Sequence, residues 1–474
     1  MDDDVASGSI SRQLAEFVVG LRETAPPAPV LERMRLHVLD TLGCQLAFAT
    51  LPWSERVWRY VQSRDTTGPA TVAFHGAKIA PELAAFANAA FTHGFELDDV
   101  DMRTTTHPGA TVVPAALAVA QKHPTSGSEL VTAVAAGYEV MIRIALGGVG
   151  MPYRGYHASA VVGGFGAAAA VAYLEGLDVD QTAHALGICA SRAGGISEFT
   201  ISGGMEKRLH GAYGALTGIE AVGLAQAGVT SPLQAIEGRR GLLNAITATP
   251  SPESIVRDLG REYLAAGTGI KRHCCCGGQH TTLDGVSELV TRHGFGPEQI
   301  DRIRVRLNPR EYDAVAMIQR PEDVISAQFS VAFGIGLRLV NGSNGFRDYV
   351  DARLDDERIL ALADKVVCER TAPDALIAGD GPSEVEVALI DGTVHRIHVS
   401  HPRGSSDSPL TEEEIIAKFD DLAGDVLGEA GTARVLGLVR DLISLPDVGV
   451  LADAIVARNG YEVRPLERLT AAAR

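Results

Sequence analysis

The chain has 474 residues, a formal net charge of −17 and 46% hydrophobic residues. This length predicts two domains. The acidic excess argues against nucleic acid or an anionic membrane as a partner, because both are bound by basic surfaces. The sequence has no uninterrupted apolar run of membrane-spanning length. The start, MDDDVASGSI, lacks the basic and apolar parts of a signal peptide, which predicts a cytoplasmic protein.

Apolar residues recur at three- and four-residue spacing in the first part of the chain, which predicts helices. The clearest stretches are 9–21, 31–48 and 129–146. The stretch GGFGAAAAVAYLEGLD is rich in Ala and Gly and predicts a central buried helix, because small side chains let helices approach closely. Its GGFG is a weak cofactor motif. No strand precedes it, and no acidic residue follows about twenty positions on.

The pattern changes after about Ile300. DRIRVRL alternates apolar and polar residues, which predicts a strand. SEVEVALIDGTVHRIHVS contains two alternating runs around Asp391-Gly392, which predicts a β-hairpin. Helical stretches are expected between these strands, around 324–339 and 356–366.

A last helical region follows a polar loop. Thr411 and Glu414 have the spacing of a capping box at its start, and the region extends to about 456. The expected fold is mainly α with an α+β insert: a large all-helical domain formed by both chain ends plus a smaller α/β lid domain. The expected boundaries are 1–268 for the first helical part, 269–405 for the α+β lid domain and 406–474 for the C-terminal helical part.

Polar residues gather in four stretches of this apolar chain. The first, HGFELDDVDMRTTTHPG, ends in His107 followed by a Pro-Gly turn and an apolar run. A histidine before such a turn can point into a cleft, but an acidic loop that caps the next helix explains the pattern equally well. The stretch also contains Glu96, Asp98, Asp99, Asp101 and Arg103. Acidic groups so close repel one another unless some are paired or protonated.

The second and third stretches place polar residues at expected helix starts. His157 precedes the Ala/Gly-rich helix, where a lone histidine is more often structural. Lys207, Arg208 and His210 open another apolar helix. Cations at a helix N-terminus oppose the helix dipole, which makes sense if an anion binds there too. A surface lysine explains each of these residues singly.

The fourth stretch is KRHCCCGGQH, from Lys271 to His280. Zinc sites usually space their thiolates as pairs such as C-x₂-C, so three adjacent cysteines do not easily face one ion. The upstream bases and the glycine turn favour an anion instead. A metal site remains possible, but an anion-binding loop is the preferred interpretation.

These stretches, in this order and spacing, resemble the MmgE/PrpD family, which includes 2-methylcitrate dehydratase, cis-aconitate decarboxylase and iminodisuccinate epimerase. The motifs that carry the resemblance run from about residue 30 to 420. They are HGFELDD…THPGATVVPAALA, GYHASAVVGGFGAAAAVAYLEGLD, ALGICASRAGGISEF, EKRLHGAYGALTGIEAVGLA, IKRHCCCGGQHTTLDG and AQFSVAFGIGL. The resemblance implies a helical domain with a smaller α/β lid, a homodimer, and neither an organic cofactor nor a required metal.

Residue by residue, the resemblance implies a catalytic role for His107, His157 and Lys207, and a carboxylate-binding role for Lys271. Three positions depart from the family pattern. They are Glu96 in place of an aspartate, Val100 in place of a polar threonine and Phe333 in place of a tyrosine. These departures weigh against cis-aconitate decarboxylation. The further candidate substrate-binding residues are Glu96, Asp99, Arg103, His280 and Phe333.

The expected chemistry begins at a carbon next to a carboxylate, where cations stabilise the charge that develops as a proton leaves. One neutral imidazole can take that proton and a second can deliver one. The leading hypothesis is a cofactor-independent, metal-free dehydratase of a small hydroxy-di- or tricarboxylate. An epimerase or isomerase of a dicarboxylic acid comes second, a decarboxylase third, and a carboxylate-binding protein without turnover is the non-enzymatic alternative. The sequence does not tell which histidine is the acid and which the base.

Overall fold

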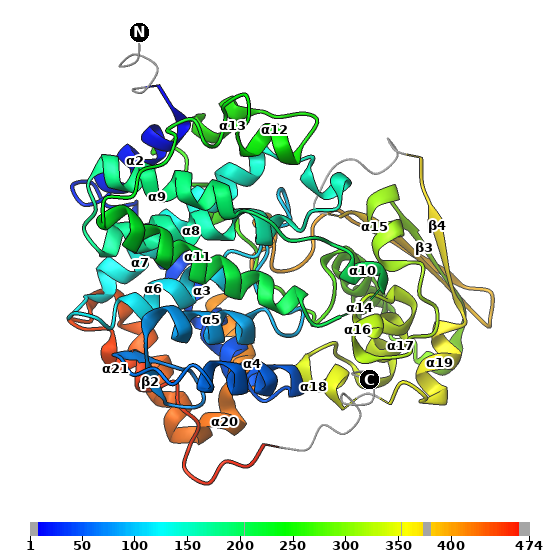
Figure 1. Cartoon of the computed structure of the whole chain (residues 1–474). Helices are drawn as coiled ribbons and strands as arrows, with labels where there is room; N and C mark the ends of the chain where they lie inside the picture. The colour runs from blue at the N-terminus through cyan, green and yellow to red at the C-terminus, as the bar shows by residue number, and fades with distance from the viewer. Residues whose placement is uncertain (1–7, 203, 352, 373–380, 464–474) are drawn as a thin grey trace. The chain divides into compact units, whose positions relative to one another are not determined.

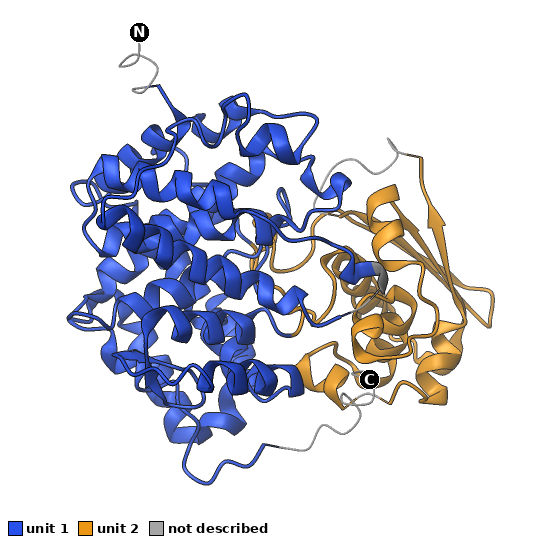
Figure 2. Ribbon diagram, viewed as in Figure 1, with its two compact units in different colours: residues 1–94, 98–268, 411–463 blue, residues 95–97, 269–410, 464–474 orange. Residues whose placement is uncertain are grey.

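The computed structural model describes residues 8–202, 204–351, 353–372 and 381–463 (Figure 1). These residues form two compact units. Unit 1 comprises 8–94, 98–268 and 411–463, and unit 2 comprises 95–97 and 269–410 (Figure 2). The predicted C-terminal helical part ends at 474, and its last residues, 464–474, lie outside the described part of the chain.

Unit 1 is helical apart from one small antiparallel sheet, in which β1 (Ala70–Thr71) pairs with β2 (Lys78–Ile79). Its helices from the first part of the chain are α2 (Ile10–Gly20), α3 (Ala28–Phe48), α4 (Pro52–Gln62), α5 (Pro81–Thr92), α6 (Gly109–Val119), α7 (Gly127–Gly147), α8 (Ala158–Leu174), α9 (Val179–Arg192), α10 (Phe199–Ser202), α11 (Lys207–Gln226), α12 (Leu242–Ile246) and α13 (Pro252–Val256). Its helices from the C-terminal part are α20 (Glu412–Arg440) and α21 (Gly449–Ala452).

Helix α8 lies at the centre of unit 1, as its Ala/Gly-rich sequence predicts. It packs against α6, α7, α9 and α11. A Cβ added at Gly218 of α11 would lie 2.4 Å from the Cβ of Ala167 on α8, which is closer than such atoms approach. Glycine at this position therefore allows the two helices to pack closely.

Helix α7 is the one helix in the described part of the chain that is long and apolar enough to cross a membrane. However, 94% of its most apolar 18-residue window is buried by the rest of the protein, which is typical of a core helix. The buried Arg143 and Glu139 form an ion pair on this helix, with Nε and Oε1 2.6 Å apart. Arg143 also donates to the carbonyl oxygens of Ile255 and Arg257, so its charge is well satisfied.

Helix α20 completes the core of unit 1 from the C-terminal part of the chain. The predicted capping box is present, because Thr411 Oγ1 accepts from the Glu414 amide and the Glu414 carboxylate accepts from the Thr411 amide. The helix packs along α3, and Lys418 Nζ lies 2.6 Å from the buried Asp40 carboxylate. Both ends of the described chain thus contribute to one helical core.

Unit 2 combines a four-stranded sheet with short helices. Its strands are β3 (Ile300–Leu307), β4 (Val366–Arg370), β5 (Ser383–Leu389) and β6 (Val394–Val399). Its helices are α14 (His280–His293), α15 (Pro309–Val315), α16 (Val324–Gln328), α17 (Val331–Asn341), α18 (Phe346–Val350) and α19 (Glu357–Ala363). The strand order is β4-β3-β5-β6, with β3 and β4 parallel and the other pairs antiparallel.

The predicted fold class is confirmed: the protein is mainly helical with a small mixed sheet. Two details differ from the expectation in unit 2. The helical stretch expected over 324–339 is two helices, because Ser330 is extended and its hydroxyl accepts from the Phe333 amide to start α17. The stretch expected over 356–366 ends as a helix at Ala363, and Val366 begins β4. This strand joins the sheet by pairing with β3, a long-range contact that local periodicity does not reveal.

Candidate active site

The loop before α6 is held in place by Asp99. Its Oδ2 accepts from the Tyr138 hydroxyl at 2.6 Å and lies 2.8 Å from His37 Nδ1. Its Oδ1 accepts from the Gly109 amide at 2.9 Å, and a Cβ at Gly109 would lie 2.8 Å from that same oxygen. Glycine therefore lets the helix start close to the carboxylate. Asp99 is buried and uses both oxygens inside unit 1, so a substrate-binding role for it stays a prediction that would require these bonds to change.

His107 is fixed at the end of this loop. Its amide donates to Ser159 Oγ at 2.9 Å. Its ring Nδ1 lies 2.7 Å from the carbonyl oxygen of Asp99 and 3.2 Å from Oδ2 of Asp98. Both partners are acceptors, so the ring carries its proton on Nδ1 and leaves Nε2 with a lone pair. A histidine in this tautomer can accept a proton at Nε2 while the carboxylate stabilises the resulting charge.

Asp98 also binds a second imidazole. His93 Nδ1 lies 2.7 Å from the same Oδ2, and both side chains are almost fully buried. Burial alone would raise the pKa of Asp98, but the charges and hydrogen bonds of His107 and His93 bring that pKa well below its usual range. Burial lowers the pKa of His93 to about 4, although the carboxylate opposes the shift. A negative carboxylate therefore lies between two imidazoles, of which His93 is neutral.

His157 and His210 form a second pair of imidazoles. Their Nδ1 atoms lie 2.9 Å apart, so one ring donates a proton that the other accepts. His157 caps the start of α8 and is partly exposed, whereas His210 lies in the first turn of α11. Burial, followed by the nearby imidazoles, lowers the pKa of His157 well below its usual range. Burial and the charge of Lys207 lower that of His210 to about 4.

The two pairs form one histidine cluster, which consists of His93, His107, His157 and His210. The ring centres of His93 and His107 are 5.1 Å apart, those of His93 and His157 5.7 Å, and those of His107 and His157 6.5 Å. Phe199 packs edge-on against His157, and Lys207 Nζ lies 5.6 Å from the centre of the Phe199 ring. Unit 1 thus brings together all three predicted catalytic residues, His107, His157 and Lys207.

Helix α11 begins at Lys207, as the sequence predicts. Lys207 and Arg208 are both buried. Arg208 is held by the carbonyl oxygen of Gly94 and stacks over Trp53, with its guanidinium 4.2 Å from the ring centre. The charge of Lys207 lowers the pKa values of His93 and His210, which places it electrostatically within the cluster. Arg208 serves the packing of unit 1, whereas the charge of Lys207 acts on the imidazoles.

The side chain of Arg103 makes polar contacts with residues of unit 1. It pairs with the buried Asp101 carboxylate and donates to the carbonyl oxygen of Leu264 at 2.8 Å. Thr104 donates its amide and hydroxyl to the other oxygen of Asp101. The arrangement stabilises the loop, so the substrate-binding role predicted for Arg103 stays a prediction without a contact that favours it.

Unit 2 holds a second buried group of charges around Lys271. Lys271 Nζ donates to the Glu96 carbonyl oxygen at 3.1 Å and lies 3.7 Å from the Glu96 carboxylate. Glu96 has a positive φ of 55°, which is uncommon for a non-glycine residue. The structure therefore brings two of the predicted substrate-binding residues together as an ion pair, and their role toward a ligand stays a prediction.

His280 and Phe333 are also buried in unit 2. His280 Nε2 lies 3.4 Å from the Cys275 carbonyl oxygen, and its ring packs edge-on against His273. His273 in turn lies 3.0 Å from the Asp284 carboxylate. Phe333 is fully buried in α17, where it fills the core of unit 2. For these two predicted residues the contacts point to structure, and a substrate contact stays a prediction.

The cysteine run is part of the folded loop. The thiol of Cys274 donates to the Phe95 carbonyl oxygen at 3.1 Å, and the Cys276 amide donates to that of Gln328. Burial raises the pKa of Cys275, so it remains a thiol. A neutral, buried thiol is a poor metal ligand and a poor nucleophile.

In the described part of the chain, the group whose ligand atoms come close enough for a metal ion is His93, Asp98 and His107, all within 4.8 Å of one another. Each imidazole, however, directs Nδ1 at an oxygen, and His107 Nδ1 also faces the Asp99 carbonyl. These contacts are those of N–H donors, and a metal would have to displace both protons. Hydrogen bonds account for the arrangement.

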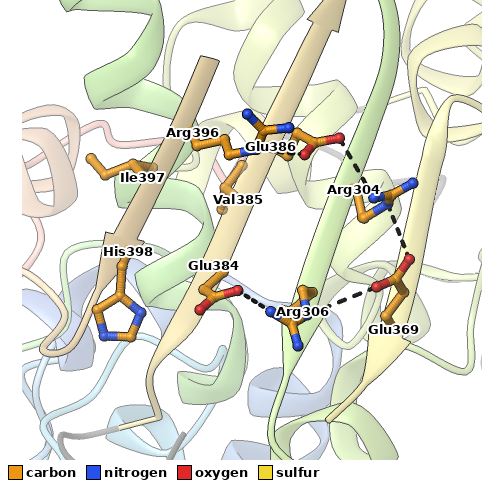
Figure 3. Close-up of a pocket in the computed structure, with 9 residues that line it drawn as sticks. All are labelled: Arg304, Arg306, Glu369, Glu384, Val385, Glu386, Arg396, Ile397 and His398. Carbon is orange, nitrogen blue, oxygen red and sulfur yellow. Dashed lines mark hydrogen bonds and ion pairs between the residues drawn. The ribbon is translucent and has the colours of Figure 1, made fainter. Parts of the chain in front are cut away.

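A polar hollow of about 610 Å³ lies on the outer face of the sheet in unit 2 (Figure 3). Its charged side chains pair with one another: Arg304 with Glu369 and Glu386, Arg306 with Glu384 and Glu369, and Arg396 with Glu386. Three arginines thus meet three glutamates, and the hollow offers no net attraction to an anion. We do not regard it as the active site.

Sequence reasoning missed the roles of His93, Asp98 and His210. Asp98 lies in the acidic loop and His210 in the basic helix start, and neither is among the site residues that the sequence predicts. His93 is separated from Asp98 by only five positions, within the same HGFELDD motif. A search for histidines next to the acidic loop would have found it.

Comparison with known proteins shows the family to which the chain belongs. Residues 12–255 match the MmgE/PrpD N-terminal domain and residues 273–442 the MmgE/PrpD C-terminal domain. The chain belongs to the MmgE/PrpD family. It is 27% identical to the cis-aconitate decarboxylase-like protein oryM of Aspergillus oryzae, over 95% of this chain and 98% of that protein. It is 28% identical to cis-aconitate decarboxylase of Aspergillus terreus, over 96% of this chain and 97% of that protein, and 26% identical to that of Homo sapiens, over 96% of each.

Proposed function

We propose that this protein is a cofactor-independent lyase that removes water from a small hydroxy-di- or tricarboxylate. The observation that carries the proposal is the histidine cluster, in which two imidazoles bind one buried carboxylate and the charge of Lys207 acts on the rings. Membership of the MmgE/PrpD family, whose relatives named above are cis-aconitate decarboxylases or similar to them, supports a carboxylic acid as the substrate.

In this proposal His107 is the base. Its proton on Nδ1 is held by Asp98 and the Asp99 carbonyl, so Nε2 accepts the proton from the carbon next to a carboxylate. The Asp98 carboxylate stabilises the imidazolium that forms. Lys207 stabilises the negative charge that develops on the substrate carboxylate as the C–H bond breaks.

His157 is the proposed acid. It delivers the Nε2 proton to the hydroxyl group as the C–O bond breaks, and water leaves. The Nδ1–H of His210 donates to Nδ1 of His157, which places the proton of His157 on Nε2. After water and product have left, the proton held by His107 returns to His157 Nε2 through solvent, and both imidazoles are restored. One proton moves from carbon to His107 and one from His157 to oxygen, so the elimination is balanced. Two separate proton carriers suit dehydration, which needs an acid and a base.

Lys271 is proposed to bind a substrate carboxylate, as the resemblance implies. It is buried within unit 2, where its Nζ lies 3.7 Å from the Glu96 carboxylate. The homodimer that the resemblance implies and the cytoplasmic location remain predictions, and sedimentation of the purified protein tests the first. No cofactor enters the proposed steps.

Decarboxylation is the second candidate, because the relatives named above carry that activity in their names. Against it stand Glu96, Val100 and Phe333, which depart from the family pattern. Epimerisation of a dicarboxylic acid needs the same two proton carriers, acting on opposite faces of one carbon. Binding without turnover is the non-enzymatic outcome.

The test is a screen of citrate, malate and cis-aconitate followed by NMR in D₂O. Loss of water gives an alkene signal, decarboxylation releases CO₂, and epimerisation gives deuterium uptake without net elimination. His107→Gln should lose deuterium exchange, whereas His157→Gln should exchange without eliminating. Each change should lower the rate by roughly 10²–10⁴-fold. The exposed His123→Gln is the matched control. Parent-like rates in both site variants would refute the assignment.

A further inference from the structure

His93 is a buried imidazole to which the proposed mechanism gives no task. Its ring lies beside both proposed proton carriers, with its centre 5.1 Å from that of His107 and 5.7 Å from that of His157. Its Nδ1 is bound by Asp98 at 2.7 Å, which fixes the proton on that nitrogen. The other ring nitrogen, Nε2, therefore carries a lone pair and faces away from the carboxylate.

This lone pair is buried and unused. Among the residues that the structure describes, none forms a hydrogen bond with His93 Nε2. The side chain is 1% exposed. A buried acceptor without a donor is unfavourable, and such groups in folded proteins usually have a partner or a function. Ionisation does not resolve the problem, because burial lowers the pKa of His93 to about 4 and keeps the ring neutral.

Because His93 Nε2 is a hydrogen-bond acceptor, its partner must be a hydrogen-bond donor. A carboxylate presents only lone pairs at neutral pH, so it cannot donate to this nitrogen. A hydroxyl group can. We propose that His93 Nε2 accepts a hydrogen bond from the hydroxyl group of the substrate, so that the site selects hydroxy acids over their deoxy analogues. Asp98 is then a positioning residue, because it fixes the tautomer of His93 that makes this contact.

This inference rests on the proposed function and narrows its substrate class. A site built to bind a hydroxyl group rejects an analogue without one, since its buried acceptor is left unpaired. The unsaturated acid cis-aconitate has no hydroxyl, so the inference favours dehydration over decarboxylation. In the dehydration, the same hydroxyl that His93 orients is the one that leaves with a proton from His157.

The experiment compares two ligand pairs that differ by one hydroxyl group: citrate with propane-1,2,3-tricarboxylate, and malate with succinate. Binding to the full-length protein is measured by calorimetry. His93→Asn keeps an N–H for Asp98 but has no acceptor at the Nε2 position, whereas His93→Gln places its amide oxygen near that position. His123→Asn is the control at an exposed site.

We expect the wild-type protein to bind the hydroxy member of at least one pair about tenfold more tightly, the size of a typical hydrogen-bond contribution. His93→Asn should bring the ratio close to one by weakening the hydroxy ligand only, and His93→Gln should restore part of it. Equal binding by the wild type, an unchanged ratio in His93→Asn, or no binding of either pair overturns the inference. If His93→Asn does not melt cooperatively, His93→Phe replaces it.

The proposed dehydratase activity and the proposed hydroxyl contact of His93 can be refuted independently of each other. A hydroxyl preference that depends on His93, without loss of water from any ligand, upholds the hydroxyl site and overturns the dehydratase. Loss of water without a preference that depends on His93 does the reverse.

Discussion

The sharpest test of the proposed base is Asp98→Asn. The change removes one negative charge but keeps the size of the side chain and an oxygen that can accept from both imidazoles. In the structure Oδ2 lies 3.2 Å from His107 Nδ1. At an effective dielectric constant of about 20, two unit charges at this distance attract by about 5 kcal/mol.

The expected loss follows from this interaction. The charges of a carboxylate and an imidazolium are spread over several atoms, so about 2.5–5 kcal/mol is a reasonable range for the lost stabilisation. If His107 becomes an imidazolium in the transition state, the rate should fall by about 10²–10⁴-fold. The dissociation constant of a hydroxy ligand should change much less, because in this proposal Asp98 stabilises a charge that develops on His107 as the proton is transferred.

The assay is the rate of alkene formation from the best hydroxy acid, measured together with deuterium exchange at the carbon. Both rates should fall equally, because the base takes part in both. Asp101→Asn is a useful comparison, since Asp101 is equally buried in the same loop but pairs with Arg103. A full rate in Asp98→Asn, in a protein that melts like the wild type, would refute His107 as the base. A fall in elimination alone would assign Asp98 to the acid side instead.

Three further predictions follow from the same contacts. His93 should lower the free energy of unfolding by up to about 3 kcal/mol as the pH drops from 6.5 to 4, because a histidine in the unfolded chain binds a proton near 6.5, whereas the pKa of His93 is about 4 in the folded protein. His93→Asn should flatten this decline in urea titrations. Lys207→Ala and Lys271→Ala should each weaken carboxylate binding by about tenfold or more in calorimetry, since each removes a charge-assisted partner. Unchanged binding in both variants would show that the two lysines do not bind the substrate carboxylate. Exhaustive chelation and Cys275→Ser should each leave most of the activity. Tightly bound stoichiometric zinc that is needed for turnover would contradict the interpretation that His93 and Asp98 are joined by a hydrogen bond and hold no metal.

Much of the helical unit could be predicted because its signals are local. The capping box at Thr411 and the small residues of α8 each specify their own helix. Strand β4 could not be predicted in this way, because its partner β3 lies about sixty residues earlier in the chain. Periodicity over 356–366 fits a helix that continues, and only pairing with β3 makes Val366 a strand residue.

The candidate site shows the same division. His107, His157 and Lys207 were predicted through the resemblance of their motifs to the MmgE/PrpD family, because the local pattern at each position fits a structural role as well. His93 follows the end of α5, and its signal in the sequence is its place beside the acidic loop, which does not tell which atoms meet. Its importance comes from Asp98, and the shared oxygen of that carboxylate is visible only in three dimensions.

The acidic loop also explains why neighbouring carboxylates can have different tasks. The sequence raises the problem that several acidic groups so close should repel one another. The structure gives each its own donors: Asp98 has two imidazoles, Asp99 has a tyrosine, a histidine and a backbone amide, and Asp101 has an arginine and a threonine. Asp99 and Asp101 thereby hold the loop rigid.

Asp98 differs from its two neighbours because one of its partners is His107, the proposed base. The other carboxylates are bound by hydroxyl, amide and guanidinium donors, whose protonation does not change near neutral pH, apart from His37 in the core. A proton that arrives at His107 therefore finds a negative charge already in place and needs no rearrangement of the loop. This preorganisation is the physical reason why, in our proposal, the proton is taken up at His107.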